Sequence, residues 1–187
     1  MILNLPNSIT FFRIALIPVF VLVFYLPFGW ANIAAAAIFT LASITDWVDG
    51  YLARMLKQES SFGAFLDPVA DKLMVVVAIV LLVETHPSIY IALPSIVIVA
   101  REILISALRE WMAELGSRET LQVSLIGKSK TSAQLVSLTM MIYADPIYGL
   151  PTFMLGLVVY YLAAFFTLAS MVNYLRAAWP VIRKHAG

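Results

Sequence analysis

The sequence has no cysteine, only two histidines and few charged residues, and each of these shortages excludes a class of protein. Without cysteine there can be no disulfide, thiolate metal ligand or cysteine nucleophile, although this does not fix the compartment. Charged residues make up 12% of the chain, whereas a soluble domain carries roughly a quarter. The net charge of +1 provides no general attraction for polyanions, so we expect no nucleic-acid partner.

Hydrophobic residues take the place of the missing charges. They make up 62% of the 187 residues, and the mean hydropathy is +0.93. This excess is too large for a soluble protein of this size, because a small globule has much surface to cover with polar groups. We therefore expect an integral membrane protein with lipids around it, and a single domain spanning residues 1–187.

Six apolar segments are long enough to cross a bilayer, which takes about 20 residues each. They cover roughly residues 11–29, 31–56, 64–84, 88–112, 129–146 and 149–178. Backbone in lipid must satisfy its own hydrogen bonds, so the fold class predicted is all-α, a bundle of six transmembrane helices. The alanines at 34–37 resemble a signal-peptide cleavage site but lie inside the second segment, so we expect no cleavage.

The basic residues predict which way the bundle faces. All of them lie near the termini or near the second and fourth breaks between segments, whereas the other breaks hold only Glu84 and Asp145 as charges. Loops rich in lysine and arginine stay in the cytoplasm. We therefore expect both termini, and the second and fourth loops, on the cytoplasmic side.

Four aspartates stand out against this apolar background. Asp46 and Asp49 share one helical face with Gly50 and Ala53, and Asp67 and Asp71 are four residues apart on the next segment. If these segments run antiparallel, the carboxylates meet near the cytoplasmic surface and repel one another unless cations neutralise them. Oxygen ligands without cysteine or histidine favour a hard ion, Mg²⁺ or Mn²⁺.

Two alternatives apply to this group. The carboxylates could form structural ion pairs with Arg54 and Lys72, but two cations cannot neutralise four closely spaced anions. Gly50 and Ala53 could let the helices approach closely, or leave room for a flat substrate group beside the metals. Both roles are compatible.

The spacing of these residues resembles the signature of the CDP-alcohol phosphatidyltransferase family. The matching residues are Asp46-x-x-Asp49-Gly50-x-x-Ala53-Arg54, then eight residues, then Gly63-x-x-x-Asp67-x-x-x-Asp71. The resemblance extends to 7–13, 100–111 and 126–131. It implies that an alcohol attacks the lipid-linked phosphorus of CDP-diacylglycerol and releases CMP. Outside the signature it favours glycerol 3-phosphate as acceptor, a homodimer, and a place in the bacterial cytoplasmic (inner) membrane.

The resemblance also implies roles for single residues. Asp46, Asp49, Asp67 and Asp71 would hold two metal ions, and Asp71 would also be the catalytic base. The residues implied to bind CDP-diacylglycerol are Asn7, Thr10, Gly50, Ala53, Arg54 and Gly63. Asn7 could equally cap the first helix, and Arg54 could face lipid headgroups.

The acceptor site is predicted from the remaining cations, because glycerol 3-phosphate is a dianion. Arg101 is the strongest candidate, since it follows a long apolar run where an unpaired charge is costly. We expect no ion pair with Glu102, because adjacent residues point in different directions on a helix. Arg109, Lys130 and Arg13 complete the predicted phosphate site, while Arg118 and Lys128 are predicted to face lipid phosphates.

Two other functions would also explain carboxylates inside a membrane protein. The same chemistry could use inositol phosphate, serine or phosphatidylglycerol as acceptor. A divalent-cation transporter would also need such carboxylates, but it predicts acids near the membrane centre, and here nine of eleven fall on the cytoplasmic half. A lipid-binding scaffold would not need four converging aspartates.

Overall fold

The computed structural model describes residues 5–56, 61–115 and 125–185, and for 5–7, 46–54, 56, 61–65, 67, 68, 71, 125–130, 184 and 185 it describes the backbone alone. Within these ranges the chain forms six α-helices and no sheet. They are α1 (Leu5–Phe24), α2 (Ala31–Leu56), α3 (Ser61–Thr85), α4 (Ile89–Glu114), α5 (Leu125–Tyr143) and α6 (Thr152–His185). The all-α prediction is therefore confirmed.

The helices differ from the predicted segments mainly at their ends. α1 begins at Leu5 and α6 continues to His185, because a helix can extend past the apolar residues into polar sequence. α5 ends at Tyr143, before the predicted residue 146, since Ala144 has a φ of 59° and leaves the right-handed helical region. Hydropathy thus located each helix but did not predict the residues at which it begins and ends.

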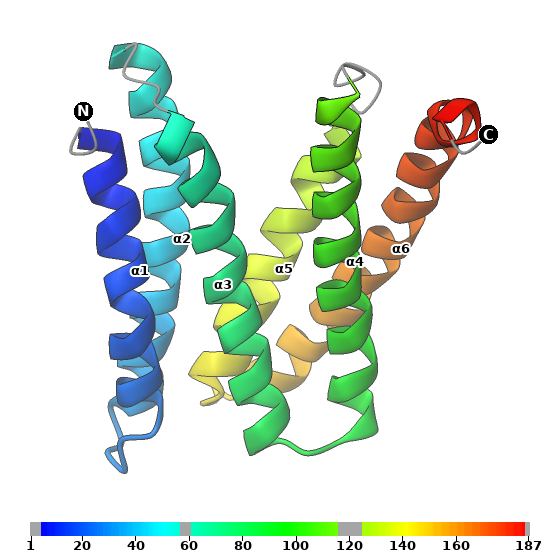
Figure 1. The fold of residues 1–187 in the computed structure, drawn as a ribbon. Helices are drawn as coiled ribbons and strands as arrows, with labels where there is room; N and C mark the ends of the chain where they lie inside the picture. The colour runs from blue at the N-terminus through cyan, green and yellow to red at the C-terminus, as the bar shows by residue number, and fades with distance from the viewer. Residues whose placement is uncertain (1–4, 57–60, 116–124, 186–187) are drawn as a thin grey trace.

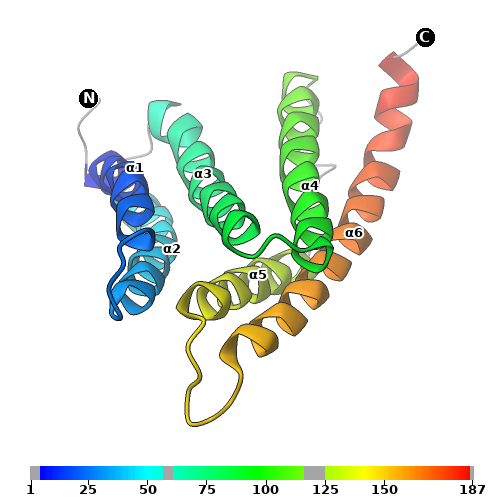
Figure 2. The ribbon, with the colours of Figure 1, turned by 90° about the horizontal axis from the view of Figure 1, so that it is seen from below.

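Consecutive helices run up and down through the bundle. The start of α1, the end of α2, the start of α3, the end of α4, the start of α5 and the end of α6 all lie at one end (Figure 1). We call this the terminal end, because the N- and C-termini are both there. α1 contacts α2 and α3, α5 contacts α2 and α6, and α4 contacts α3 and α6 (Figure 2).

Large apolar side chains fill the space between the helices. The main core includes Phe20 of α1, Phe39 of α2, Leu82 of α3, Ile98 of α4 and Met141 of α5, each at most 2% exposed. A smaller second cluster consists of Ile105 and Met112 of α4 with Tyr174 and Ala178 of α6. The second cluster fixes α4 against α6 near the terminal end.

The outer surface of the bundle is also apolar. Leu22, Ile96 and Phe165 are at least 63% exposed, and many other large apolar side chains face outward. Such a surface is typical of contact with lipid. Among the described residues, Ile89–Glu114 and Thr152–Arg183 are long and apolar enough to cross a membrane, and Ser8–Phe24 and Ala31–Thr45 are shorter apolar stretches. These features identify a membrane protein.

Candidate functional site

The backbone carries the four aspartates on two helices that contact each other. Asp46 and Asp49 lie in the last turns of α2, and Asp67 and Asp71 lie in the first turns of α3. At 1.5 Å per residue, all four are about 9–15 Å along the helix from its terminal end. Their side chains lie outside the described residues, as do those of Gly50, Ala53, Arg54 and Gly63.

α1 presents a buried polar group beside this helix pair. Thr10 and Arg13 are 0% and 1% exposed. Together with the core residues Ile17 and Phe20 they follow a helical spacing that defines one face, and α1 contacts both α2 and α3. Thr10 and Arg13 therefore lie on the inward face of α1, nearer the terminal end than its apolar core residues. Asn7 is one turn earlier, with its side chain outside the described residues.

Burial of Arg13 has an electrostatic consequence. A guanidinium cannot lose its proton in a protein, so its charge must be balanced when it leaves water. Arg13 is about 12 Å along α1 from Leu5, and the aspartates are at comparable distances along α2 and α3 from the terminal ends of those helices. A buried cation at this level suits a site that holds anionic phosphates.

Arg101 is buried, and the expectation about Glu102 is wrong. The side chain lies on the face of α4 that carries Ile98 and Ile105 and is 5% exposed as a residue. Its Nη1 donates a hydrogen bond to Glu102 Oε1 at 2.5 Å. Neighbouring Cβ atoms diverge, but both side chains are long and flexible enough for their tips to meet. Arg101 is therefore partly neutralised before any ligand arrives.

Tyr174 on α6 links Arg101 to Arg109. The Arg101 guanidinium carbon lies 5.8 Å from the centre of the Tyr174 ring, and that of Arg109 lies 5.2 Å from it. Arg109 Nη2 also donates a hydrogen bond to the Tyr174 hydroxyl at 2.9 Å. The sequence did not reveal this role, because nothing in the pattern distinguishes Tyr174 from the other seven tyrosines.

The predicted acceptor residues are thus only partly described. Arg101 and Arg109 both contact the ring of Tyr174. Arg109 is exposed, whereas Arg101 is buried. Lys130 lies in the second turn of α5, near the terminal end of the bundle, with its side chain outside the described residues, as is that of Lys128. Arg13 belongs to α1, which is not in contact with α4.

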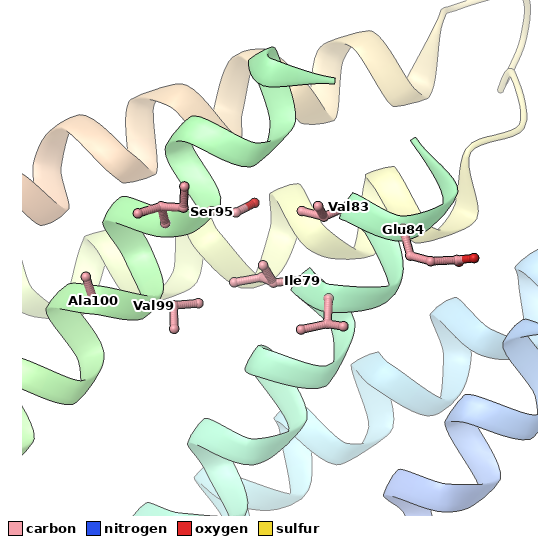
Figure 3. A pocket seen from close by; sticks show the side chains of 8 residues that line it. Ile79, Val83, Glu84, Ser95, Val99 and Ala100 are labelled. Carbon is pink, nitrogen blue, oxygen red and sulfur yellow. The ribbon is translucent and has the colours of Figure 1, made fainter. Parts of the chain in front are cut away.

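The described part of the molecule also has apolar hollows away from these residues. An open groove of about 530 Å³ runs between α3 and α4 and is lined by apolar side chains such as Ile79, Val83 and Val99 (Figure 3). Its Ser95 hydroxyl donates to the Ile91 carbonyl oxygen at 2.7 Å and lies 3.0 Å from the Tyr160 hydroxyl. A groove of this composition lacks the cations needed for phosphate chemistry.

Comparison with known proteins assigns the chain to a family. Residues 3–173 match the family model described as CDP-alcohol phosphatidyltransferase. The chain belongs to this family. The matched range includes all four aspartates and both described arginines of α4, so the resemblance carried by the signature is confirmed along most of the sequence.

Curated relatives are similar over nearly their whole length. A protein of Pseudomonas fluorescens is 50% identical over 184 residues, which cover 97% of this chain and 93% of the relative. Proteins of Salmonella paratyphi A and Escherichia coli K12 are each 52% identical over 175 residues, which cover 94% of both chains. All three are named CDP-diacylglycerol–glycerol-3-phosphate 3-phosphatidyltransferase.

Proposed function

We propose that this protein transfers the phosphatidyl group of CDP-diacylglycerol to glycerol 3-phosphate, giving phosphatidylglycerophosphate and CMP. The observation that carries the proposal is the near-complete similarity to relatives named for this activity, at 50–52% identity. The geometry supports it, because the signature aspartates lie in the last turns of α2 and the first turns of α3, and α1, which carries the buried Arg13, contacts both helices.

The reaction is a displacement at the lipid-linked phosphorus. The acceptor hydroxyl oxygen forms the new P–O bond, the bond from that phosphorus to the oxygen bridging it to CMP breaks, and CMP leaves with that oxygen. The hydroxyl proton goes to a base, a role we assign to Asp71. Asp71 follows Asp67 by four residues on α3, so the two residues share one helical face, and a general base must sit beside the reacting phosphorus.

The aspartates also fit a metal site, in keeping with a family that is generally dependent on divalent metals. Their donor set is four carboxylates near the terminal ends of two contacting antiparallel helices, and hard ions prefer oxygen ligands. We propose that Asp46, Asp49, Asp67 and Asp71 hold two ions, Mg²⁺ or Mn²⁺. Bound there, the metal supplies positive charge that stabilises the pyrophosphate as its bond breaks.

The nucleotide end of CDP-diacylglycerol is assigned to the same three helices. Thr10 and Asn7 of α1 would contact the nucleotide, Arg54 the pyrophosphate, and Gly50, Ala53 and Gly63 would border the cytidine where a larger side chain would intrude. The position of Thr10 supports this assignment, because it is buried on the inward face of α1, and α1 contacts both α2 and α3.

The acceptor phosphate is assigned to Arg101, Arg109, Lys130 and Arg13. Glycerol 3-phosphate carries its charge on one small group, so several cations must approach it together. Arg101 and Arg109 support the assignment because they gather on one tyrosine, and Arg109 is exposed. Glu102 neutralises only part of this positive charge.

The placement in the membrane follows from the charges. We propose that all six helices cross the bacterial inner membrane, that both termini and the active site face the cytoplasm, and that residues 1–187 form one domain acting as a homodimer. Arg109 and Arg183 lie near the ends of α4 and α6 and so toward the terminal end, whereas Glu84 and Asp145 lie toward the opposite end. This is the distribution that a cytoplasmic terminal end requires.

An acceptor panel tests the function directly. The purified protein is incubated with CDP-diacylglycerol, Mg²⁺ and one acceptor at a time, and CMP release is followed. We expect release with glycerol 3-phosphate, and little with inositol phosphate, serine or phosphatidylglycerol. Preference for another acceptor would overturn the substrate. Absence of release with every acceptor would overturn the enzyme class and leave a cation transporter to be tested by metal flux.

A further inference from the structure

We propose that Tyr174 is a positioning residue for the acceptor site: it holds the guanidinium groups of Arg101 and Arg109 together so that both face one phosphate. This inference rests on the proposed function, because it takes these two arginines as ligands of glycerol 3-phosphate. Tyr174 itself contacts the arginines, and no contact with the substrate is required of it.

The spacing of the two arginines explains why such a residue is needed. They are eight residues apart on α4, which separates their backbones by about 12 Å along the helix axis and turns them to different directions. A single phosphate cannot bridge two cations that remain so far apart. Both guanidinium carbons nevertheless lie within 5.8 Å of the centre of one ring, that of Tyr174. The tyrosine thus contacts both cations, although they come from turns of α4 that are about 12 Å apart.

The ring is held firmly enough to act as a support. Tyr174 is 8% exposed and packs with Ile105, Met112 and Ala178 in the second core cluster, which joins α4 to α6. Cations are attracted to the face of an aromatic ring, and the attraction is stronger where water is excluded. The hydroxyl adds a second constraint, since it accepts a hydrogen bond from Arg109 Nη2.

Both arginines keep donors for a ligand while they contact the tyrosine. A guanidinium has five N–H groups. Arg101 donates from Nη1 to Glu102 Oε1, and its buried Nε has no hydrogen-bond partner among the described residues. Arg109 uses Nη2 for the tyrosine hydroxyl and is exposed. Two guanidinium groups with free N–H donors are suited to bind a phosphate.

The test replaces the hydroxyl and then the ring. In Tyr174→Phe the ring remains and the hydrogen bond to Arg109 is lost, so we expect KM for glycerol 3-phosphate to rise about threefold to tenfold. In Tyr174→Leu both arginines lose their support, and the rise should be larger. In Tyr174→Phe, kcat and KM for CDP-diacylglycerol should stay close to those of the unmodified enzyme.

Tyr160→Phe is the matched control. Tyr160 is also buried on α6, and its hydroxyl lies 3.0 Å from that of Ser95, far from the arginines. It should leave KM for glycerol 3-phosphate unchanged. A second readout combines Tyr174→Phe with Arg109→Ala. If the hydroxyl acts through Arg109, the double variant should have the same KM as Arg109→Ala alone.

The outcomes separate this inference from the proposed function. An active unmodified enzyme whose KM for glycerol 3-phosphate is unchanged in Tyr174→Phe would overturn the role of the hydroxyl, as would additive effects in the double variant. If Tyr174→Phe and Tyr160→Phe lose activity equally, and the loss matches the decrease in their thermal stability, Tyr174 has only a structural role. If the unmodified enzyme releases no CMP with glycerol 3-phosphate, the proposed function fails and the inference fails with it.

Discussion

The proposed function depends mainly on individual charged side chains, and Arg101 shows which of their properties a sequence can predict. Its position after an apolar run made it the strongest candidate for the acceptor phosphate, a role that stays a prediction, and the structure places it 5% exposed on α4. The same reasoning wrongly excluded Glu102 as a partner, because it considered the direction of the Cβ atoms and not the reach of the side chains. Tyr174 was missed, since its neighbours come from another helix.

Removal of the Arg101 charge should weaken use of the acceptor. We expect Arg101→Ala to raise KM for glycerol 3-phosphate at least about tenfold, since a hydrogen bond to a charged group contributes about 1.5–3 kcal/mol. KM for CDP-diacylglycerol should change little. Steady-state CMP release measures both constants.

The matched control for this variant is Arg183→Ala, which removes an exposed arginine of α6. Its KM for the acceptor should stay unchanged. Because Arg101→Ala removes an ion-pair partner of Glu102, size-exclusion chromatography must confirm that the variant is folded. A folded Arg101→Ala enzyme with unaltered KM would remove Arg101 from the acceptor site.

At the scale of helices, close approach between α5 and α6 depends on one glycine. A Cβ placed on Gly156 would lie 2.9 Å from Met140 Cβ, 3.0 Å from Met141 Cγ and 3.1 Å from the Ser137 carbonyl oxygen. Met140 Cβ and the carbonyl oxygen are fixed to the backbone of α5, so they cannot rotate away. Small residues at such crossings let membrane helices pack closely.

Gly156→Ala should therefore push α5 and α6 apart. We expect a destabilisation of about 1–3 kcal/mol, the usual result of overpacking. Thermal unfolding of the detergent-solubilised protein measures it. Gly29→Ala is the control, because a Cβ there would meet nothing within 4 Å. Equal stability of the two variants would contradict the close packing described for Gly156.

At the scale of the whole molecule, the proposed orientation can be tested because the natural chain has no cysteine. Gly29→Cys places a single thiol between α1 and α2, and Arg183→Cys places one near the end of α6. In intact spheroplasts, a membrane-impermeant maleimide should label Gly29→Cys alone. Arg183→Cys should react only after permeabilisation, and its labelling in intact spheroplasts would contradict a cytoplasmic terminal end.

The fold was more predictable than the site. Long apolar segments fix the number and order of the helices, because backbone in lipid has few alternatives to the helix. The spacing of the signature residues from Asp46 to Asp71 predicted the family. The four carboxylates in an apolar bundle predicted a bound cation, because such charges must be neutralised. Contacts such as Arg109 with Tyr174 depend on how α4 and α6 pack, which no pattern within one helix can reveal.

The central claim is that the four signature aspartates perform the transfer. The most direct test measures CMP release by the unmodified enzyme and by Asp71→Asn at a series of Mg²⁺ concentrations. The unmodified enzyme should lose CMP release in a chelator and recover it with Mg²⁺. Asp71→Asn should stay folded and inactive at every Mg²⁺ concentration, whereas Asp145→Asn, at an exposed acid of the opposite end, should behave as the unmodified enzyme. Substantial release by Asp71→Asn, or release unaffected by the chelator, would contradict the account.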